Sequence, residues 1–285
     1  MGIILGIDIG GSTTKIVGAN GDEYIGMLQV RAADQITSLY GAVGNFLRSY
    51  KLKPSDMEAV YLTGVGASFV DEQIYDIRTF KSNEFEAIGR GALSLTGLSK
   101  ALVVSMGTGT AFVRAFEKGA AFEKGAAEHI VTANHLGGTG IGGGTIIGLA
   151  SQMLGKSDVD AIIALAEKGD LKKVDLTVGD IFGKEVQSLP SHLTAANFGK
   201  IESTVSEADI ALGIINMVFE TVGMMSVLAL KNDEIKDVIL TGTLATFPMA
   251  KTVFEKFTEF TDYNFIIPRD AVFATAIGAI TRQGL

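Results

Sequence analysis

Short apolar runs alternate with amphipathic stretches along this chain, in an order typical of α/β proteins. Residues 3–9 are almost wholly apolar and predict a buried strand, and apolar positions recur at helical spacing between residues 36 and 47. Asp34 is placed to cap that helix. In the first hundred residues the pattern predicts strands over 3–9, 13–17, 24–30 and 59–63, and helices over 36–47 and from Asn83 onward.

The second half opens with the pattern of the first. Residues 101–106 predict a buried strand, a Gly-rich turn follows, and residues 110–115 predict the returning strand. Asp8-Ile9-Gly10 and Ser105-Met106-Gly107 match at a separation of about 97 residues. The repeat predicts two related α/β domains, residues 1–100 and 101–285, that face each other across a cleft. The later pattern predicts helices over 145–154, 159–167, 210–230, 250–257 and from 270, and strands over 237–241 and 264–267.

Glycine is concentrated in short clusters, with 35 glycines against 4 prolines. Glycines let backbone N–H groups approach an anion closely, and neighbouring Ser and Thr hydroxyls add donors. The third cluster precedes a predicted helix, whose N-terminus would present unpaired N–H groups to a phosphate. Because two clusters occupy matching positions of the halves, we expect a polyphosphate in the cleft. The three clusters are Asp8-Ile9-Gly10-Gly11-Ser12-Thr13-Thr14-Lys15, Gly107-Thr108-Gly109-Thr110 and Gly137-Gly138-Thr139-Gly140-Ile141-Gly142-Gly143-Gly144-Thr145.

Two carboxylates at the start of the helix after Asn83 are candidates for acid–base chemistry. If Asn83 is the N-cap, Glu86 occupies the capping-box position, which gives it a structural role. For Glu84 two interpretations are open, a structural role near the positive end of the helix dipole and a catalytic role. Asp8, at the end of the first strand, suits a carboxylate that faces Mg²⁺ directly or through water.

Composition excludes several classes of function. The net charge is −8, the wrong sign for a protein that binds a nucleic-acid backbone. The chain has no cysteine, which excludes disulfides, iron–sulfur clusters and a cysteine nucleophile. The first residues lack the charged segment of a signal peptide, so a cytoplasmic location is expected. Residues 210–230 are apolar enough to suggest a membrane span, but Glu220 at their centre favours a helix buried in the core or at a subunit interface.

These motifs together resemble the type II pantothenate kinases, over almost the whole chain. The resemblance rests on the three glycine clusters above and on Ser82-Asn83-Glu84-Phe85-Glu86, Ser105-Met106, Ala166-Glu167-Lys168-Gly169-Asp170, Val178-Gly179-Asp180-Ile181-Phe182-Gly183, Ala196-Asn197-Phe198-Gly199, Thr241-Gly242-Thr243 and Ala276-Ile277-Gly278-Ala279.

The resemblance implies duplicated actin/hexokinase-like (ribonuclease H-like) domains and transfer of a phosphoryl group from MgATP to pantothenate, the first step of coenzyme A synthesis. It implies that Glu84 is the catalytic carboxylate and that Gly242 and Thr243 contact the adenosine. It further implies a homodimer, and coenzyme A or its thioesters as candidate inhibitors. The substrate contacts that it implies come from Glu84, Ser105 and Thr108.

One position departs from the family pattern. Where those kinases have an arginine before the long glycine cluster, this chain has Asn134-His135-Leu136. The mode of pantothenate recognition is therefore open, and we expect His135 to take part of the arginine's role.

Two alternatives share the predicted fold. A hexose or N-acetylhexosamine kinase would be expected to carry an aspartate base where this chain has Ser105. A non-kinase ATP-switch protein, such as the activators of 2-hydroxyacyl-CoA dehydratases, has a similar start but holds an iron–sulfur cluster through cysteines.

Overall fold

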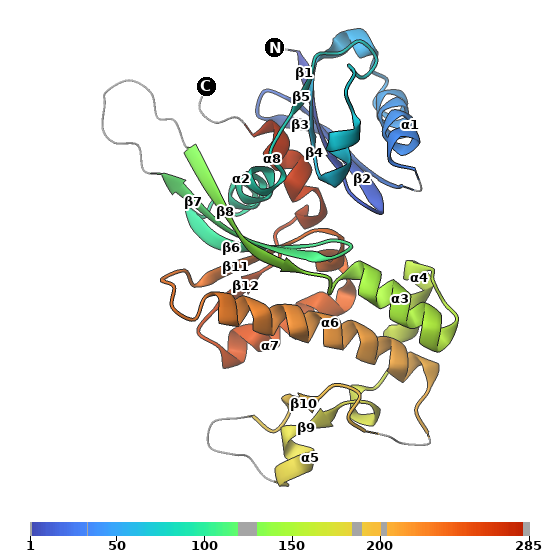
Figure 1. The fold of residues 1–285 in the computed structure, drawn as a ribbon, viewed down its shortest axis with the longest axis vertical. Coiled ribbons are helices and arrows are strands. Elements are labelled where there is room, and N and C mark those ends of the chain that lie inside the picture. The colour runs from blue at the N-terminus through green and yellow to red at the C-terminus, as the bar shows by residue number, and fades with distance from the viewer. Residues whose placement is uncertain (1, 33, 119–129, 184–189, 201–203, 282–285) are drawn as a thin grey trace.

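The structure, a computed structural model, describes residues 2–32, 34–118, 130–183, 190–200 and 204–281. It contains two five-stranded mixed sheets with helices around and between them (Figure 1). The N-terminal sheet has the order β3-β2-β1-β4-β5, and the C-terminal sheet has the order β12-β11-β6-β7-β8. The strands of these two sheets are β1 (Ile3–Ile9), β2 (Thr13–Asn20), β3 (Glu23–Arg31), β4 (Met57–Thr63), β5 (Thr79–Lys81), β6 (Lys100–Met106), β7 (Thr110–Lys118), β8 (Ile130–Thr139), β11 (Asp237–Thr241) and β12 (Asn264–Ile266).

The sheets repeat one arrangement at their centres. Strand β1 pairs antiparallel with β2 and parallel with β4, and β6 pairs antiparallel with β7 and parallel with β11. Both halves therefore begin with a hairpin whose first strand lies beside a later parallel strand. The α-helices are α1 (Gln35–Ser49), α2 (Glu84–Thr96), α3 (Gly143–Leu154), α4 (Val159–Ala166), α5 (Val178–Phe182), α6 (Glu207–Ala229), α7 (Pro248–Phe260) and α8 (Ala274–Ile280).

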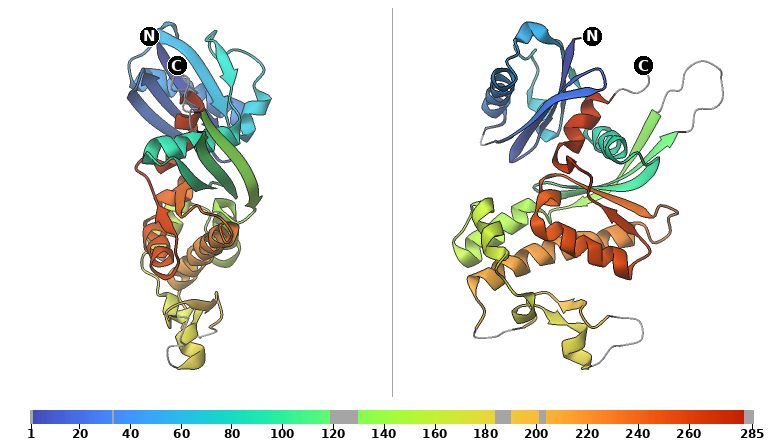
Figure 2. Two further views of the ribbon diagram at one scale, coloured as in Figure 1. Left: turned by 90° about the vertical axis from the view of Figure 1, so that its left-hand side faces the viewer. Right: turned by 180° about the vertical axis from the view of Figure 1, so that it is seen from behind.

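Helices α2 and α8 cross between the two sheets (Figure 2). They meet through small residues, because a Cβ on Gly91 would collide with the carbonyl oxygen of Ala274 and one on Gly278 with that of Ala87. Each helix packs on the sheet of the other half: α2 on β6 and β7, and α8 on β1 and β4. The last helix of the chain thus covers the first strand.

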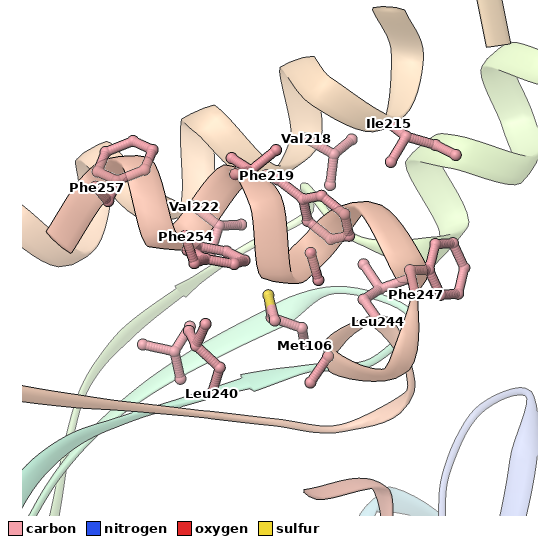
Figure 3. Close-up of a cluster of buried hydrophobic side chains, with 14 of the residues drawn as sticks. Met106, Ile215, Val218, Phe219, Val222, Leu240, Leu244, Phe247, Phe254 and Phe257 are labelled. Carbon is pink, nitrogen blue, oxygen red and sulfur yellow. The ribbon is translucent and has the colours of Figure 1, made fainter. Parts of the chain in front are cut away.

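The largest core lies between the C-terminal sheet and helices α6 and α7 (Figure 3). Phe219 of α6 packs against Phe254 of α7, with ring centroids 5.6 Å apart. Met106, at the end of β6, is fully buried in the same core. This core holds the ends of β6 and β11 rigidly, and the turns that follow both strands line the site described below.

Helix α6 is long and apolar enough to span a bilayer by length and composition, and 56% of its apolar window is buried inside the protein. The Glu220 carboxylate at its centre accepts hydrogen bonds from the Thr194 hydroxyl at 2.7 Å and the Asn197 amide at 2.8 Å. Both partners belong to a small lobe formed by β9 (Leu176–Thr177), α5 and β10 (Thr194–Ala196), at the end of the molecule away from β1 (Figure 1). The carboxylate in the apolar helix therefore anchors this lobe.

The structure corrects two sequence-based interpretations. Gly137, Gly138 and Thr139 lie in β8 rather than in a turn, so α3 begins at Gly143. Asn83 caps α2 as predicted, but Glu86 does not complete a capping box. Its carboxylate accepts a hydrogen bond from the buried Arg90 guanidinium at 3.1 Å instead.

Candidate functional site

A cavity of about 810 Å³ lies between the two sheets and above the crossing of α2 and α8. Its walls come from the turns after β1, β4, β6 and β11, the ends of β2 and β3, the start of α2, β8 and helices α3, α4 and α8. The lining residues are Asp8, Gly10–Thr13, Lys15, Arg31, Ala32, Val65, Glu84, Ile88, Ser105, Gly107–Ala111, Gly138, Thr139, Gly143, Gly144, Ile146, Ile147, Ser157, Val159, Gly242–Leu244, Phe247, Val272 and Thr275.

A buried ion pair forms part of the N-terminal wall. Asp8 and Lys15 face each other across the β1–β2 hairpin, and the Lys15 Nζ donates to the Asp8 Oδ2 at 3.1 Å. Both residues are at least nine-tenths buried. Gly64, which follows β4, approaches so closely that a Cβ there would lie 2.5 Å from the Asp8 Oδ1. The glycine is therefore required for the position of this carboxylate.

Glu84 is the first residue of α2 and shares the cavity with this pair. Burial raises the pKa of the Glu84 carboxyl above its ordinary value, the negative charge of Asp8 raises it further, and Lys15 opposes the shift. Arg90 fixes the surrounding backbone, because its guanidinium donates to the Ser82 hydroxyl at 2.8 Å and to the Gly278 carbonyl at 3.0 Å. A half-buried carboxylate with a raised pKa is suited to accept a proton.

The C-terminal wall carries glycines and hydroxyls. The N–H groups of Gly143 and Gly144 donate to the carbonyls of Gly107 and Thr108, each at 2.9 Å. These contacts press the start of α3 against the β6–β7 turn, and a Cβ on Gly142 would lie 2.6 Å from the Thr108 carbonyl oxygen. Two N–H groups that the sequence suggested for a phosphate therefore hold the turn itself.

The turn after β11 closes one end of the cavity. Gly242 has a φ of 86°, and a Cβ there would lie 2.5 Å from the Met106 carbonyl oxygen. Next to it Thr243, Leu244 and Phe247 line the cavity. Ile146 and Ile147 of α3 and Val159 of α4 also line the cavity, and these apolar side chains suit a nucleobase.

Two polar contacts join the halves across the cavity. The hydroxyls of Ser12 and Thr108 lie 3.1 Å apart, which places the two glycine turns against each other. Farther out, the Arg31 guanidinium lies 3.4 Å from carboxylate oxygens of Asp158 and Asp160 at the start of α4. Asp158 is also the N-cap of that helix.

Most of the predicted site residues line the cavity, and five do not. Ile9 and Thr14 point into the interior, where each side chain is at most 1% exposed. The Thr145 hydroxyl donates to the Gly140 carbonyl and accepts from the Gly142 N–H, which keeps both Thr145 and Gly142 structural. His135 is exposed on β8 and stacks on Phe85, with ring centroids 4.0 Å apart.

The sequence reasoning missed several lining residues. Val65 could have been found, because Thr63-Gly64-Val65-Gly66-Ala67 resembles Thr241-Gly242-Thr243-Leu244-Ala245 at the end of the matching strand of the other half. Arg31 and Thr275 have no comparable signal, since one lies at a strand end and the other within an apolar stretch.

The donor set fits a metal that arrives with a nucleotide. Among the described residues no group of three or more His, Cys, Asp or Glu side chains could hold a metal ion. Mg²⁺ usually keeps several waters and is bound by one or two carboxylates together with substrate phosphates. Asp8, in the wall beside the glycine turns, offers one such carboxylate.

The two sheets and the helices between them define an α/β protein with the actin/hexokinase fold. Component A of the (R)-2-hydroxyglutaryl-CoA dehydratase of Acidaminococcus fermentans superposes with a TM-score of 0.65 at 17% identity, covering 98% of this chain and 96% of that one. The ROK hexokinase of Thermus thermophilus gives a TM-score of 0.51 at 14% identity, covering 97% and 96%. At these identities the likeness shows the fold alone.

Sequence comparison gives the family. The Fumble family model matches residues 101–263, more than half of the chain, and the chain belongs to this family. A curated relative from Bacillus cereus strain AH820, named type II pantothenate kinase, is 27% identical over 97% of this chain and 96% of its own length. A second relative with the same name, from Bacillus cereus strain G9842, is 28% identical with 97% coverage of both chains.

Proposed function

We propose that this protein is an ATP-dependent pantothenate kinase that phosphorylates the primary hydroxyl of pantothenate, the first step of coenzyme A synthesis. The observation that carries the proposal is the place of Glu84: a carboxylate of raised pKa, in one cavity with a buried Asp–Lys pair and the glycine turns. The names of the relatives supply the substrate class.

Glu84 acts as the general base. It takes the proton of the pantothenate hydroxyl while the hydroxyl oxygen attacks the γ-phosphorus of ATP. The bond from that phosphorus to the β,γ-bridging oxygen breaks, which releases ADP and 4'-phosphopantothenate and leaves the proton on Glu84. A positioned base of this kind contributes a rate factor of about 10²–10⁴.

Charge on the phosphates is stabilised from both walls. Phosphoryl transfer asks a protein mainly for positioning and for stabilisation of the charge on the transferred group. Lys15 supplies a positive charge, and the turns around Gly10 and Gly107 supply backbone N–H groups and hydroxyls. Mg²⁺ enters as MgATP, with Asp8 as its contact on the protein, directly or through water.

Substrate recognition is assigned to Ser105, Thr108 and His135 in addition to Glu84. The first two line the cavity, whereas His135 does not line it and stacks on Phe85, which follows Glu84 in the sequence. If His135 contacts the pantothenate carboxylate, His135→Ala raises KM for pantothenate and leaves KM for ATP unchanged. If His135→Ala instead lowers both the stability and kcat and leaves KM for pantothenate unchanged, His135 serves only to pack on Phe85.

A homodimer and a cytoplasmic location complete the proposal. Met224 and Leu228 on α6 are 45% and 62% exposed, at positions that continue the line of Met217 and Thr221 along one side of the helix. A second copy packed there would cover this apolar stripe. Light scattering reports the mass directly, and Leu228→Glu should convert the dimer to a monomer.

The test is an ATP-coupled assay over pantothenate, pantetheine, hexoses and N-acetylhexosamines, with coenzyme A added in a second series to detect inhibition. Turnover of pantothenate that disappears in Glu84→Gln and persists in Glu86→Gln supports the proposal. Turnover of a hexose with pantothenate untouched would overturn it and favour the sugar kinase alternative. The activator alternative is disfavoured by the absence of cysteine from the chain.

A further inference from the structure

Thr275 presents an unusual hydroxyl to the cavity. It lies on α8, is only 7% exposed, and lines the cavity floor. Within the described part of the chain its Oγ1 has no hydrogen-bond partner, and it is not among the unpaired side-chain atoms that are closed off from the cavity. Thr14, Thr63 and Thr241 also have unpaired hydroxyls, but they are fully buried and do not line the cavity.

Thr275 lies where α2 and α8 cross. Gly91 of α2 contacts Ala274 of α8, and Gly278 of α8 contacts Ala87 of α2 in the same way. The crossing is therefore nearly symmetric, with residue 87 equivalent to 274 and residue 91 equivalent to 278. The same matching pairs Thr275 with Ile88, and both line the cavity. One side of this near-symmetric floor is apolar, and the other carries the unpaired hydroxyl.

The region above this point is bounded by the glycine turns of both halves. Helix α8 packs closely on β1 at Gly6, two residues before Asp8. A Cβ on Gly6 would collide with the Ala276 carbonyl oxygen. Ser12 and Thr108 meet across the cavity at 3.1 Å. Both turns offer glycine backbone and hydroxyls, which suit an anion with several oxygens.

We propose that the Thr275 hydroxyl donates a hydrogen bond to a phosphate oxygen of the bound nucleotide at the floor of the cavity. The proposal rests on the proposed function only for the identity of the nucleotide as MgATP. It accounts for a hydroxyl that lines the cavity without a hydrogen-bond partner among the described residues, because the ligand completes its hydrogen bond.

The experiment measures nucleotide binding without any acceptor. The probe is a nonhydrolysable MgATP analogue, titrated by calorimetry into the wild type, Thr275→Val and Thr275→Ser. Loss of a hydrogen bond to a charged group should weaken binding by about tenfold or more in Thr275→Val. Thr275→Ser keeps the hydroxyl and should stay near the wild type. Thr63→Val removes an unpaired hydroxyl outside the cavity and should leave binding unchanged.

Two results would overturn the proposal. Unchanged nucleotide affinity in a folded Thr275→Val protein would reduce Thr275 to a packing residue. A raised KM for pantothenate with unchanged nucleotide affinity would assign the hydroxyl to the acceptor. If instead pantothenate is not a substrate while Thr275→Val still weakens the analogue, the proposed function fails and this inference stands.

Discussion

The two walls of the cavity are built from the same strand-and-turn pattern but carry different chemistry. Every charged residue among those that line it comes from the first hundred residues: Asp8, Lys15, Arg31 and Glu84. From Ser105 onward the lining residues are glycines, hydroxyl residues and apolar side chains. The N-terminal wall therefore carries the charges of the cavity, as the proposed proton transfer requires, and the C-terminal wall offers the proposed nucleotide backbone groups and neutral side chains.

The glycines at equivalent places in the two halves show one source of this difference, the presence of Asp8 in the first half where the second has Ser105. Gly64 and Gly242 have φ values of 85° and 86°, and each begins a 3₁₀-helix after a parallel strand. Gly64 lies against the Asp8 carboxylate, whereas Gly242 lies against the backbone of Met106. Ser105 occupies the position that Asp8 has in the first half, so the second half offers its ligand a neutral hydroxyl there.

The largest effect is expected from the base in the charged wall. Glu84→Gln should keep nucleotide binding and lower kcat by about 10²–10⁴-fold, because the amide cannot accept the proton. Steady-state kinetics with pantothenate give kcat, and analogue titration gives the affinity. The matched control is Glu86→Gln, two residues farther along α2, which loses only its bond to Arg90. If Glu86→Gln abolishes turnover and Glu84→Gln does not, the general base is Glu86 and the assignment of Glu84 is wrong.

The equivalent glycines offer a direct comparison of the walls. Alanine at either position is strained by about 1–3 kcal/mol, since φ is positive. Gly64→Ala should displace the Asp8 carboxylate and lower kcat by about tenfold, about 1.4 kcal/mol of transition-state stabilisation. Gly242→Ala should displace the turn beside Met106 and weaken nucleotide binding instead. Thermal unfolding and the two kinetic constants separate these outcomes.

Gly155→Ala serves as the control for strain alone. Gly155 also has a positive φ, 64°, but a Cβ there would meet nothing within 4 Å. It should lose stability without changing kcat or affinity. Identical kinetic effects from Gly64→Ala and Gly242→Ala would remove the proposed division between the walls.

The repeated hairpins could be predicted from the sequence because each is encoded locally. An apolar run, a glycine turn and a returning strand lie within about fifteen residues, and both β1–β2 and β6–β7 form as expected. The same holds for the caps: the side chains of Asp34 and Asn83 accept backbone N–H groups of α1 and α2. Finding the same pattern twice predicted two related α/β domains, and the resemblance to the kinase family supplied the actin/hexokinase type.

Contacts between distant segments could not be predicted in this way. Arg90 binds the Gly278 carbonyl, 188 residues away, and thereby draws Glu86 from its capping position. Thr275 has no polar neighbour in the sequence that marks it as part of a site. The division of the chain at residue 100 and the roles of the individual site residues stay predictions until they are tested by mutation.

A smaller effect is expected in the pH profile of kcat. The general base must be deprotonated, so turnover should fall as the pH drops through the raised pKa of Glu84. Asp8→Asn removes a charge that raises this pKa and should shift the acid limb to lower pH. Lys15→Met removes a charge that lowers it and should shift the limb to higher pH. For each variant, kcat between pH 4 and 8 is divided by its own maximum. The direction in which the acid limb shifts can then be read even if both variants are slow. Shifts of the opposite sign would mean that another group controls the limb.

The smallest effect concerns the charged residue that reaches across to the other wall. Arg31 pairs with Asp158 and Asp160, but the three side chains are 71%, 52% and 86% exposed, and such pairs contribute about 0–1 kcal/mol. Arg31→Gln should therefore raise KM for MgATP by only about two- to fivefold, by loosening the closure of the walls over the nucleotide. Salt at about 1 M should erase the difference, since it screens exposed charges. Lys251→Gln, which breaks an exposed pair within α7, should show no such change. A salt-independent effect of Arg31→Gln would instead indicate direct contact of the guanidinium with the nucleotide, and Asp160→Asn would then leave KM unchanged.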